Sequence, residues 1–238
     1  MTEFREIWSY LSREPLLWLT LTLVAYAIGD RAFTASGRKP HVNAVLIAVV
    51  LLSAVLALTG TTYASYFEGA KFVHFMLGPA TVALAVPLYG NLARIRRTLL
   101  PIAGAVLAGS LTAILSALGI AWALGVDGVT LVSLAPKSAT APVAMGISEN
   151  LGGSPTLTAV LVILTGIIGA VIATPLLNLI GVRDWRARGL AVGTASHGIG
   201  TARAFQVNET AGAYSGIGMG LNAVLTALLA PAILHLLF

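Results

Sequence analysis

Residues 134–155 read LAPKSATAPVAMGISENLGGSP, and this stretch decides how the rest of the chain is interpreted. Pro136 and Pro142 remove backbone donors, and Gly152 and Gly153 loosen the chain, so a continuous helix is not expected here. Broken backbone at membrane depth is tolerated only where protein or a watery cavity lines it. Such breaks are the usual construction of a transporter binding site, and the alternative is a surface loop between two spans.

A second polar stretch, residues 191–212, reads AVGTASHGIGTARAFQVNETAG and is also rich in small residues. Its tripeptide 200–202 (GTA) matches 139–141 (ATA) in the first stretch, which makes a weak internal repeat. Repeats of this kind suggest a symmetric transporter core. We place the two broken stretches at about 130–153 and 190–212.

The composition is that of an integral membrane protein. The chain has 238 residues, of which 57% are hydrophobic and 10% are charged, whereas soluble domains carry about 25% charged residues. Cysteine is absent, which excludes a disulfide framework and any cysteine-ligated metal site. The net charge of +5 is concentrated in short loops, so we interpret it as a topology signal and not as a nucleic-acid-binding surface.

The predicted fold is all-α and polytopic, with about six spanning helices plus the two broken or re-entrant stretches, which could be inverted repeats. Residues 1–15 carry apolar side chains at i, i+3, i+4 and i+7, and we expect them to lie in the membrane interface. Residues 16–238 are predicted to form a single transmembrane domain. The spans are predicted at 16–33, 43–59, 71–89, 99–124, 156–180 and 215–238.

Basic residues set the expected orientation. Most of the fourteen Lys and Arg lie in three short loops, at 31–39, 94–97 and 183–188, and the positive-inside rule assigns these loops to the cytoplasm. The span 99–124 then ends outside and the span 156–180 runs inward. The first broken stretch is therefore predicted to be a re-entrant hairpin from the outer side, and the second a hairpin from the inside. If both stretches crossed instead, the third basic loop would lie outside, against the rule.

Lys137 and Arg203 lie inside the two broken stretches. A Lys or Arg at the centre of a spanning helix costs about 2.5–3.5 kcal/mol on insertion scales, so each buried cation needs a partner. Glu149 and Glu209 could form structural ion pairs with them. The alternative is that both cations face a shared cavity and attract a small anion.

Several side chains in the same stretches could complete an anion site. Half-helix N-termini would add backbone N–H groups and a partial positive charge. The hydroxyls that could bind beside a carboxylate belong to Ser138, Thr140, Ser196 and Thr201. His197 has an unperturbed pKa near neutrality and could carry a coupling proton, or it could simply be satisfied by a neighbouring carbonyl.

Other chemistries have little support in the sequence. Gly198 and Gly200 form a GxG, but no predicted strand precedes it, so it is not a nucleotide site. Ser196 and His197 lack an Asp to orient the imidazole, and no His, Cys and Asp cluster could ligate a metal. We therefore predict no enzyme activity, no cofactor, no metal and no nucleic-acid partner.

Several sequence motifs of this chain resemble those of the LrgB/CidB family. The resemblance covers nearly the whole chain and is carried by PKSATAPVA (136–144), ENLGG (149–153), ASHGIGTARA (195–204), FEGAKF (67–72) and LGPATVALAVPLY (77–89). That family includes YohK-like bacterial inner-membrane proteins and the C-terminal half of the plastid glycolate/glycerate translocator. The resemblance therefore implies a multi-pass protein of the cell inner membrane.

The resemblance leaves two functions open. One is a secondary transporter of small 2-hydroxy or 2-oxo monocarboxylates, of the glycolate, glycerate, lactate or pyruvate class, with a proton as a candidate coupling ion. The other is an antiholin-like regulator of murein hydrolase activity that assembles with a small LrgA/CidA-type membrane protein. In either case a homo-oligomer is expected. Buried cations in broken helices favour transport of a small anion.

Overall fold

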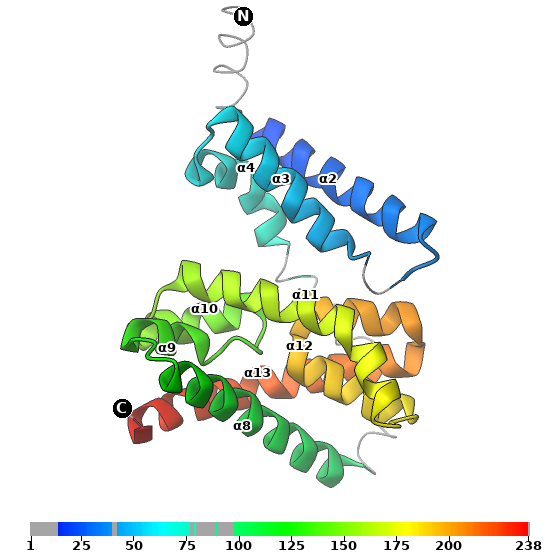
Figure 1. The fold of residues 1–238 in the computed structure, drawn as a ribbon, viewed down its shortest axis with the longest axis vertical. Coiled ribbons are helices and arrows are strands. Elements are labelled where there is room, and N and C mark those ends of the chain that lie inside the picture. Colours follow the sequence, from blue (N-terminus) through cyan, green and yellow to red (C-terminus); the bar gives the residue numbers. More distant parts are fainter. Residues whose placement is uncertain (1–13, 40–41, 77–78, 80–88, 90–97, 238) are drawn as a thin grey trace, which may run out of the picture. The chain divides into compact units, whose positions relative to one another are not determined.

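The computed structural model describes residues 14–39, 42–76, 79, 89 and 98–237, and its regular elements there are all α-helices (Figure 1). The chain divides into two compact units, Met1–Ala83 and Leu84–Phe238. Each unit is considered by itself below. The all-α fold predicted from the sequence is confirmed.

The first unit contains three described helices: α2 (Pro15–Ala35), α3 (Ala44–Thr59) and α4 (Tyr63–Phe75). Helix α2 packs against both of the others. At Gly29 a Cβ would lie 2.4 Å from the Ala44 carbonyl oxygen, so the backbones of α2 and α3 touch. Trp18 of α2 and Tyr66 of α4 form an edge-to-face aromatic pair with ring centroids 5.9 Å apart. Close backbone approach through glycine is a common way for membrane helices to associate.

The predicted span 16–33 is confirmed as α2, and the predicted span 43–59 is an apolar helix, α3, whose 16 residues are fewer than those of the helices long enough to cross a membrane. The prediction for 71–89 is wrong at its start, because α4 begins upstream, at Tyr63. Aromatic rings on successive turns of this helix stack on each other, with the centroids of Tyr63 and Phe67 5.7 Å apart. Most of the rest of that predicted span, the loop 94–97 and nearly all of the predicted interfacial segment lie outside the described residues.

The second unit is built on three long apolar helices: α8 (Leu99–Ala123), α11 (Pro155–Leu179) and α13 (Glu209–Leu237). With α2 they are the four helices, among the residues described, that are long and apolar enough to cross a membrane. They confirm the last three predicted spans, although α13 begins at Glu209, before the predicted 215. Figure 1 shows that α8, α11 and α13 alternate in direction.

The first broken stretch is a helical hairpin. Helix α9 (Gly128–Leu134), a turn at 135–140 and helix α10 (Ala141–Asn150) form what we call hairpin 1, whose tip is that turn. The hairpin is fixed to the start of α11, because Ser133 Oγ accepts a hydrogen bond from the Ser154 N–H (2.8 Å) and the Ser133 carbonyl accepts one from Thr158 Oγ1 (3.0 Å). It enters and leaves at the same end of the unit, as predicted.

The second broken stretch also folds back on itself. Helix α12 (Trp185–Val207), called hairpin 2 here, is interrupted at His197, whose backbone has φ 41° and ψ −138°. A Cβ at Gly200 would lie 3.2 Å from the Val192 carbonyl oxygen. In a straight helix these residues would be separated by about 12 Å at 1.5 Å per residue. The chain therefore reverses at His197, and the two arms of hairpin 2 lie side by side.

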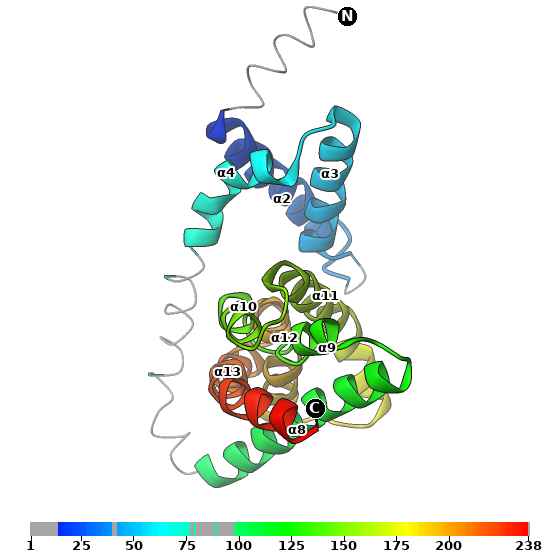
Figure 2. The same ribbon diagram turned by 90° about the vertical axis from the view of Figure 1, so that its left-hand side faces the viewer.

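The two hairpins enter the unit from opposite ends (Figures 1 and 2). Hairpin 1 packs in one cluster with the C-terminal parts of α8 and α13, which includes Leu118, Leu131, Ile147, Ala230 and Leu234. Hairpin 2 packs with the C-terminal part of α11 and the N-terminal part of α13, in a cluster formed by Leu177, Val192, Ala204 and Ala211. This opposite entry agrees with an inverted arrangement of the two stretches, and the membrane side that each faces stays a prediction.

Candidate functional site

The tip of hairpin 1 carries Lys137. The lysine is half-buried, and its ammonium donates a weak hydrogen bond to Ser138 Oγ at 3.3 Å. Lys137 forms no ion pair with any residue that the structure describes. Its predicted partner Glu149 is exposed near the far end of α10. A partly buried cation without a carboxylate beside it is unfavourable, so a role of Lys137 in binding an anion stays a prediction.

The N-terminus of α10 lies at the same tip. Thr140 is the N-cap, with extended backbone at φ −64° and ψ 148°, and its side chain makes no capping hydrogen bond. Pro142 follows within the first turn, where its missing N–H has no cost. The first N–H groups of a helix have no partner inside it and carry a partial positive charge. Lys137, the Thr140 hydroxyl and this helix start together make the tip attractive to an anion.

At the tip of hairpin 2, His197 is buried and held by a carbonyl. Its Nε2 lies 2.8 Å from the Val162 carbonyl oxygen of α11, which fixes the proton on Nε2. Its ring also fills the space at Gly166, where a Cβ would lie 2.6 Å away from it. Of the two roles considered for His197, this geometry corresponds to the structural one.

The neighbouring hydroxyls of hairpin 2 are also occupied by packing. Thr201, which is fully buried, donates to the His197 carbonyl (2.8 Å) and lies 2.9 Å from Ser215 Oγ of α13. Ser196 Oγ sits where a Cβ on Gly169 of α11 would be, which lets α12 approach α11 closely. Ser196 and Thr201 therefore stabilise the reversal of the chain and are not open to a ligand in this conformation.

The two tips meet around Val162. This residue packs in one cluster with Ala139 and Ala144 of hairpin 1, and its carbonyl binds His197 of hairpin 2. Val162 is thus in contact with the tip of each hairpin. The structure thus brings together four of the predicted site residues: Lys137, Ser138, Thr140 and His197.

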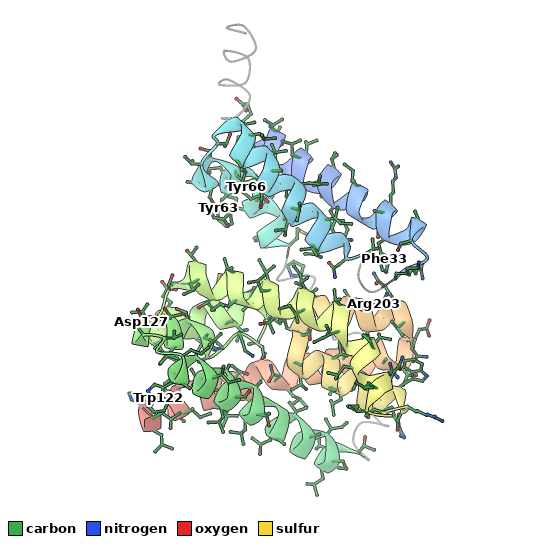
Figure 3. The ribbon with its side chains drawn as sticks, in the orientation of Figure 1. Phe33, Tyr63, Tyr66, Trp122, Asp127 and Arg203 are labelled. Carbon is green, nitrogen blue, oxygen red and sulfur yellow. The ribbon has the colours of Figure 1, made fainter. Side chains whose placement is uncertain are left out.

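Arg203 belongs to a different cluster. It lies on the second arm of hairpin 2 (Figure 3). With Trp185, Arg188 and Val207 it lines a small hollow at the base of that hairpin. Arg188 donates there to Asn178 Oδ1 at 2.8 Å and lies under the Trp185 ring at 4.9 Å. The structure places Arg203 at the base of hairpin 2 and Lys137 at the tip of hairpin 1. A direct role of Arg203 at the Lys137 site therefore stays a prediction.

Comparison with known proteins identifies the family. A model of the LrgB-like family matches residues 22–236. The chain belongs to the LrgB-like family. Holin-like protein CidB of Staphylococcus epidermidis is 34% identical over 225 residues, which is 94% of this chain and 98% of that protein. Uncharacterized protein YxaC of Bacillus subtilis is 38% identical over 221 residues, or 93% of this chain and 96% of its own. No solved structure gives a significant match.

The motif resemblance is therefore confirmed, and the chain is a membrane protein of this family. Two buried residues of this LrgB-like protein were not singled out from the sequence as site residues: Ser110 of α8 and Asn222 of α13. Both are fully buried halfway along apolar helices, and their side chains bond to each other at 2.6 Å. The signal that could have found Asn222 is an amide inside an apolar span, where polar groups are costly.

One larger hollow, of about 390 Å³, lies at the base of hairpin 1. Its lining is mostly apolar and comes from α9, the end of α10 and the end of α13, with His235 as its titratable side chain. It lacks a cation such as Lys137, so the anion site is expected at the hairpin tips and not here. The residues that line it are Gly128, Val129, Leu131, Val132, Leu151, Gly152, Pro231, Leu234 and His235.

Proposed function

We propose that this protein binds a small carboxylate anion at the meeting point of its hairpin tips and moves it across the membrane. The observation that carries the proposal is Lys137, a half-buried ammonium on broken backbone with no carboxylate among its described neighbours. Broken helices whose ends point at an ionic ligand are the construction found in secondary transporters. Two hairpins that enter from opposite ends suit a site that opens first to one side and then to the other.

The chemistry at the tip fits a 2-hydroxy or 2-oxo monocarboxylate. The Lys137 ammonium and the N-terminus of α10 would hold the carboxylate, and the Thr140 hydroxyl would bind the adjacent hydroxyl or carbonyl oxygen. Glycolate, glycerate, lactate and pyruvate are the anions to test. If transport is proton-coupled, His197 would need to use Nδ1, because Nε2 is bound to Val162. We place the protein in the cell inner membrane.

The second candidate is an antiholin-like regulator of murein hydrolase activity. The relative CidB is named holin-like, and this name favours the regulator over the carboxylate transporter. Such a regulator would act by assembly, with further copies of itself or with a small LrgA/CidA-type membrane protein. It would not need Lys137 to face a ligand.

Counterflow of labelled glycolate, glycerate, lactate and pyruvate in proteoliposomes tests the proposal. Lys137→Ala is compared with Lys71→Ala, since Lys71 is exposed on α4 and pairs with Glu68. We expect uptake of at least one anion, lost in Lys137→Ala and kept in Lys71→Ala. Lys137→Arg should also transport poorly, because a planar guanidinium does not replace a compact ammonium.

The outcomes separate the two functions. Anion uptake by the wild-type protein that survives in a folded Lys137→Ala variant would show that this lysine does not bind the substrate. Absence of uptake for all four anions, with and without an LrgA-type partner, together with a partner-dependent change in cell lysis, would support the regulator.

A further inference from the structure

Asn222 is a fully buried amide near the middle of α13. A buried amide without hydrogen bonds costs about 1–3 kcal/mol in protein mutational data, so its presence in an apolar helix requires partners. Asn222 has them on both atoms. Its Nδ2 donates to the Ser138 carbonyl at 2.9 Å, and its Oδ1 accepts from Ser110 Oγ at 2.6 Å and from Thr226 Oγ1 at 3.4 Å.

These bonds join three elements at one depth. Ser110 lies halfway along α8 and Asn222 halfway along α13, while Ser138 lies at the tip of hairpin 1. The tip is not helical, so the Ser138 carbonyl does not accept a backbone hydrogen bond within a helix. An unpaired carbonyl at membrane depth is strongly unfavourable. The Asn222 amide supplies the missing donor.

The same bonds reach the candidate ligand site through one residue. The Ser138 carbonyl binds Asn222, and the Ser138 hydroxyl accepts from Lys137 Nζ. Thr140, whose hydroxyl makes no capping hydrogen bond, follows two residues later and is the N-cap of α10. A shift of Ser138 would therefore move the ammonium and the helix start relative to each other.

We infer that Asn222 is a positioning residue, which holds the tip of hairpin 1 so that Lys137 and the N-terminus of α10 face the same ligand. The inference rests on the proposed function for its effect on transport. Its structural part, the fixing of the tip by Asn222, stands independently and is tested separately. Ser110 supports the amide by occupying its acceptor side.

The test uses the absence of cysteine in this chain. Thr140→Cys introduces a single thiol at the tip, and its maleimide labelling rate reports how often the tip opens. Asn222→Leu, of similar size, removes the donor to Ser138. We expect labelling to rise about tenfold, which corresponds to a loss of about 1.4 kcal/mol. Ser116→Ala is the matched control, because Ser116 lies on the same helix as Ser110 but binds only the Thr112 carbonyl of that helix.

Two further readings keep the test decisive. Ser110→Ala leaves the donor to Ser138 in place, so a smaller rise in labelling rate, of about threefold, is expected. If Asn222→Leu does not fold, an unchanged labelling rate in Ser110→Ala overturns the inference.

The transport measurement uses Asn222→Leu without the Thr140→Cys substitution. This variant should raise the KM for the anion with a smaller change in maximal transport rate, as expected for a positioning residue. Faster labelling in Asn222→Leu, together with no uptake of any of the four anions by the wild-type protein, would uphold the role of Asn222 and refute the proposed function. Unchanged labelling in Asn222→Leu would overturn the inference.

Discussion

The contact between hairpin 2 and α13 gives the sharpest prediction for stability. At Gly193, a Cβ would lie 1.9 Å from the carbonyl oxygen of Ser215. Four residues earlier, a Cβ at Gly189 would lie 2.1 Å from the Ala211 carbonyl oxygen. The two backbones therefore touch along a full turn. We expect Gly193→Ala to force them apart.

The size of the effect follows from the distances. Real Cβ contacts are essentially never shorter than 3.0 Å, so the separation must grow from 1.9 Å by at least 1.1 Å. The obstructing atom is backbone, which cannot rotate away as a side chain would. Overpacking of this kind costs about 1–3 kcal/mol, and the backbone contact places Gly193→Ala near the upper end. At about 2–4 °C per kcal/mol, the melting temperature should fall by about 5–10 °C.

Thermal unfolding in detergent, followed by the fluorescence of the four tryptophans, measures this change. Gly220→Ala is the control, because Gly220 is an exposed residue of α13 with no atom within 4 Å of its Cβ position. Alanine is the better helix former by about 0.5–1 kcal/mol, so this variant should be as stable as the wild type or slightly more so. If Gly193→Ala melts together with Gly220→Ala, the close approach of α12 and α13 is refuted.

Three further predictions address topology, charge and capping. In the cysteine-free background, Arg186→Cys should be labelled only from the cytoplasmic side; labelling from outside intact cells would reverse the predicted orientation. Glu149→Gln should leave the melting temperature unchanged, because Glu149 is exposed and forms no ion pair with Lys137; a drop of several degrees would restore the ion-pair hypothesis. Ser154→Ala should destabilise the protein by about 1 kcal/mol, since Ser154 Oγ caps the Leu157 N–H, and thermal unfolding should show a drop of about 2–4 °C.

The two hairpins could be predicted because their signals are visible in the sequence without knowledge of any long-range contact. Pro136 and Pro142 exclude a continuous helix, and the parity of basic loops requires a stretch that returns to the side it entered. The family motifs could also be recognised from the sequence, since each is a contiguous run of residues. Lys137 was found as a lone cation on broken backbone, and the structure places it at a tip.

What the sequence could not give depends on long-range contacts. The role of Asn222 arises from a carbonyl distant in the sequence, and nothing near it in the chain indicates that partner. His197 was open between two roles until Val162 supplied a carbonyl from another helix. Arg203 looked equivalent to Lys137 by composition, but six residues of helix beyond the reversal carry it to the base of hairpin 2.

The bond between Ser138 and Asn222 also bears on how this protein is made. Helices α9 and α10 have seven and ten residues, too short for either to be recognised as a membrane segment during synthesis. The partner that satisfies the Ser138 carbonyl is translated 84 residues later. We therefore expect hairpin 1 to stay at the membrane surface until α13 has been inserted. A chain truncated before Asn222 should leave the tip accessible to protease, however many earlier spans are in place.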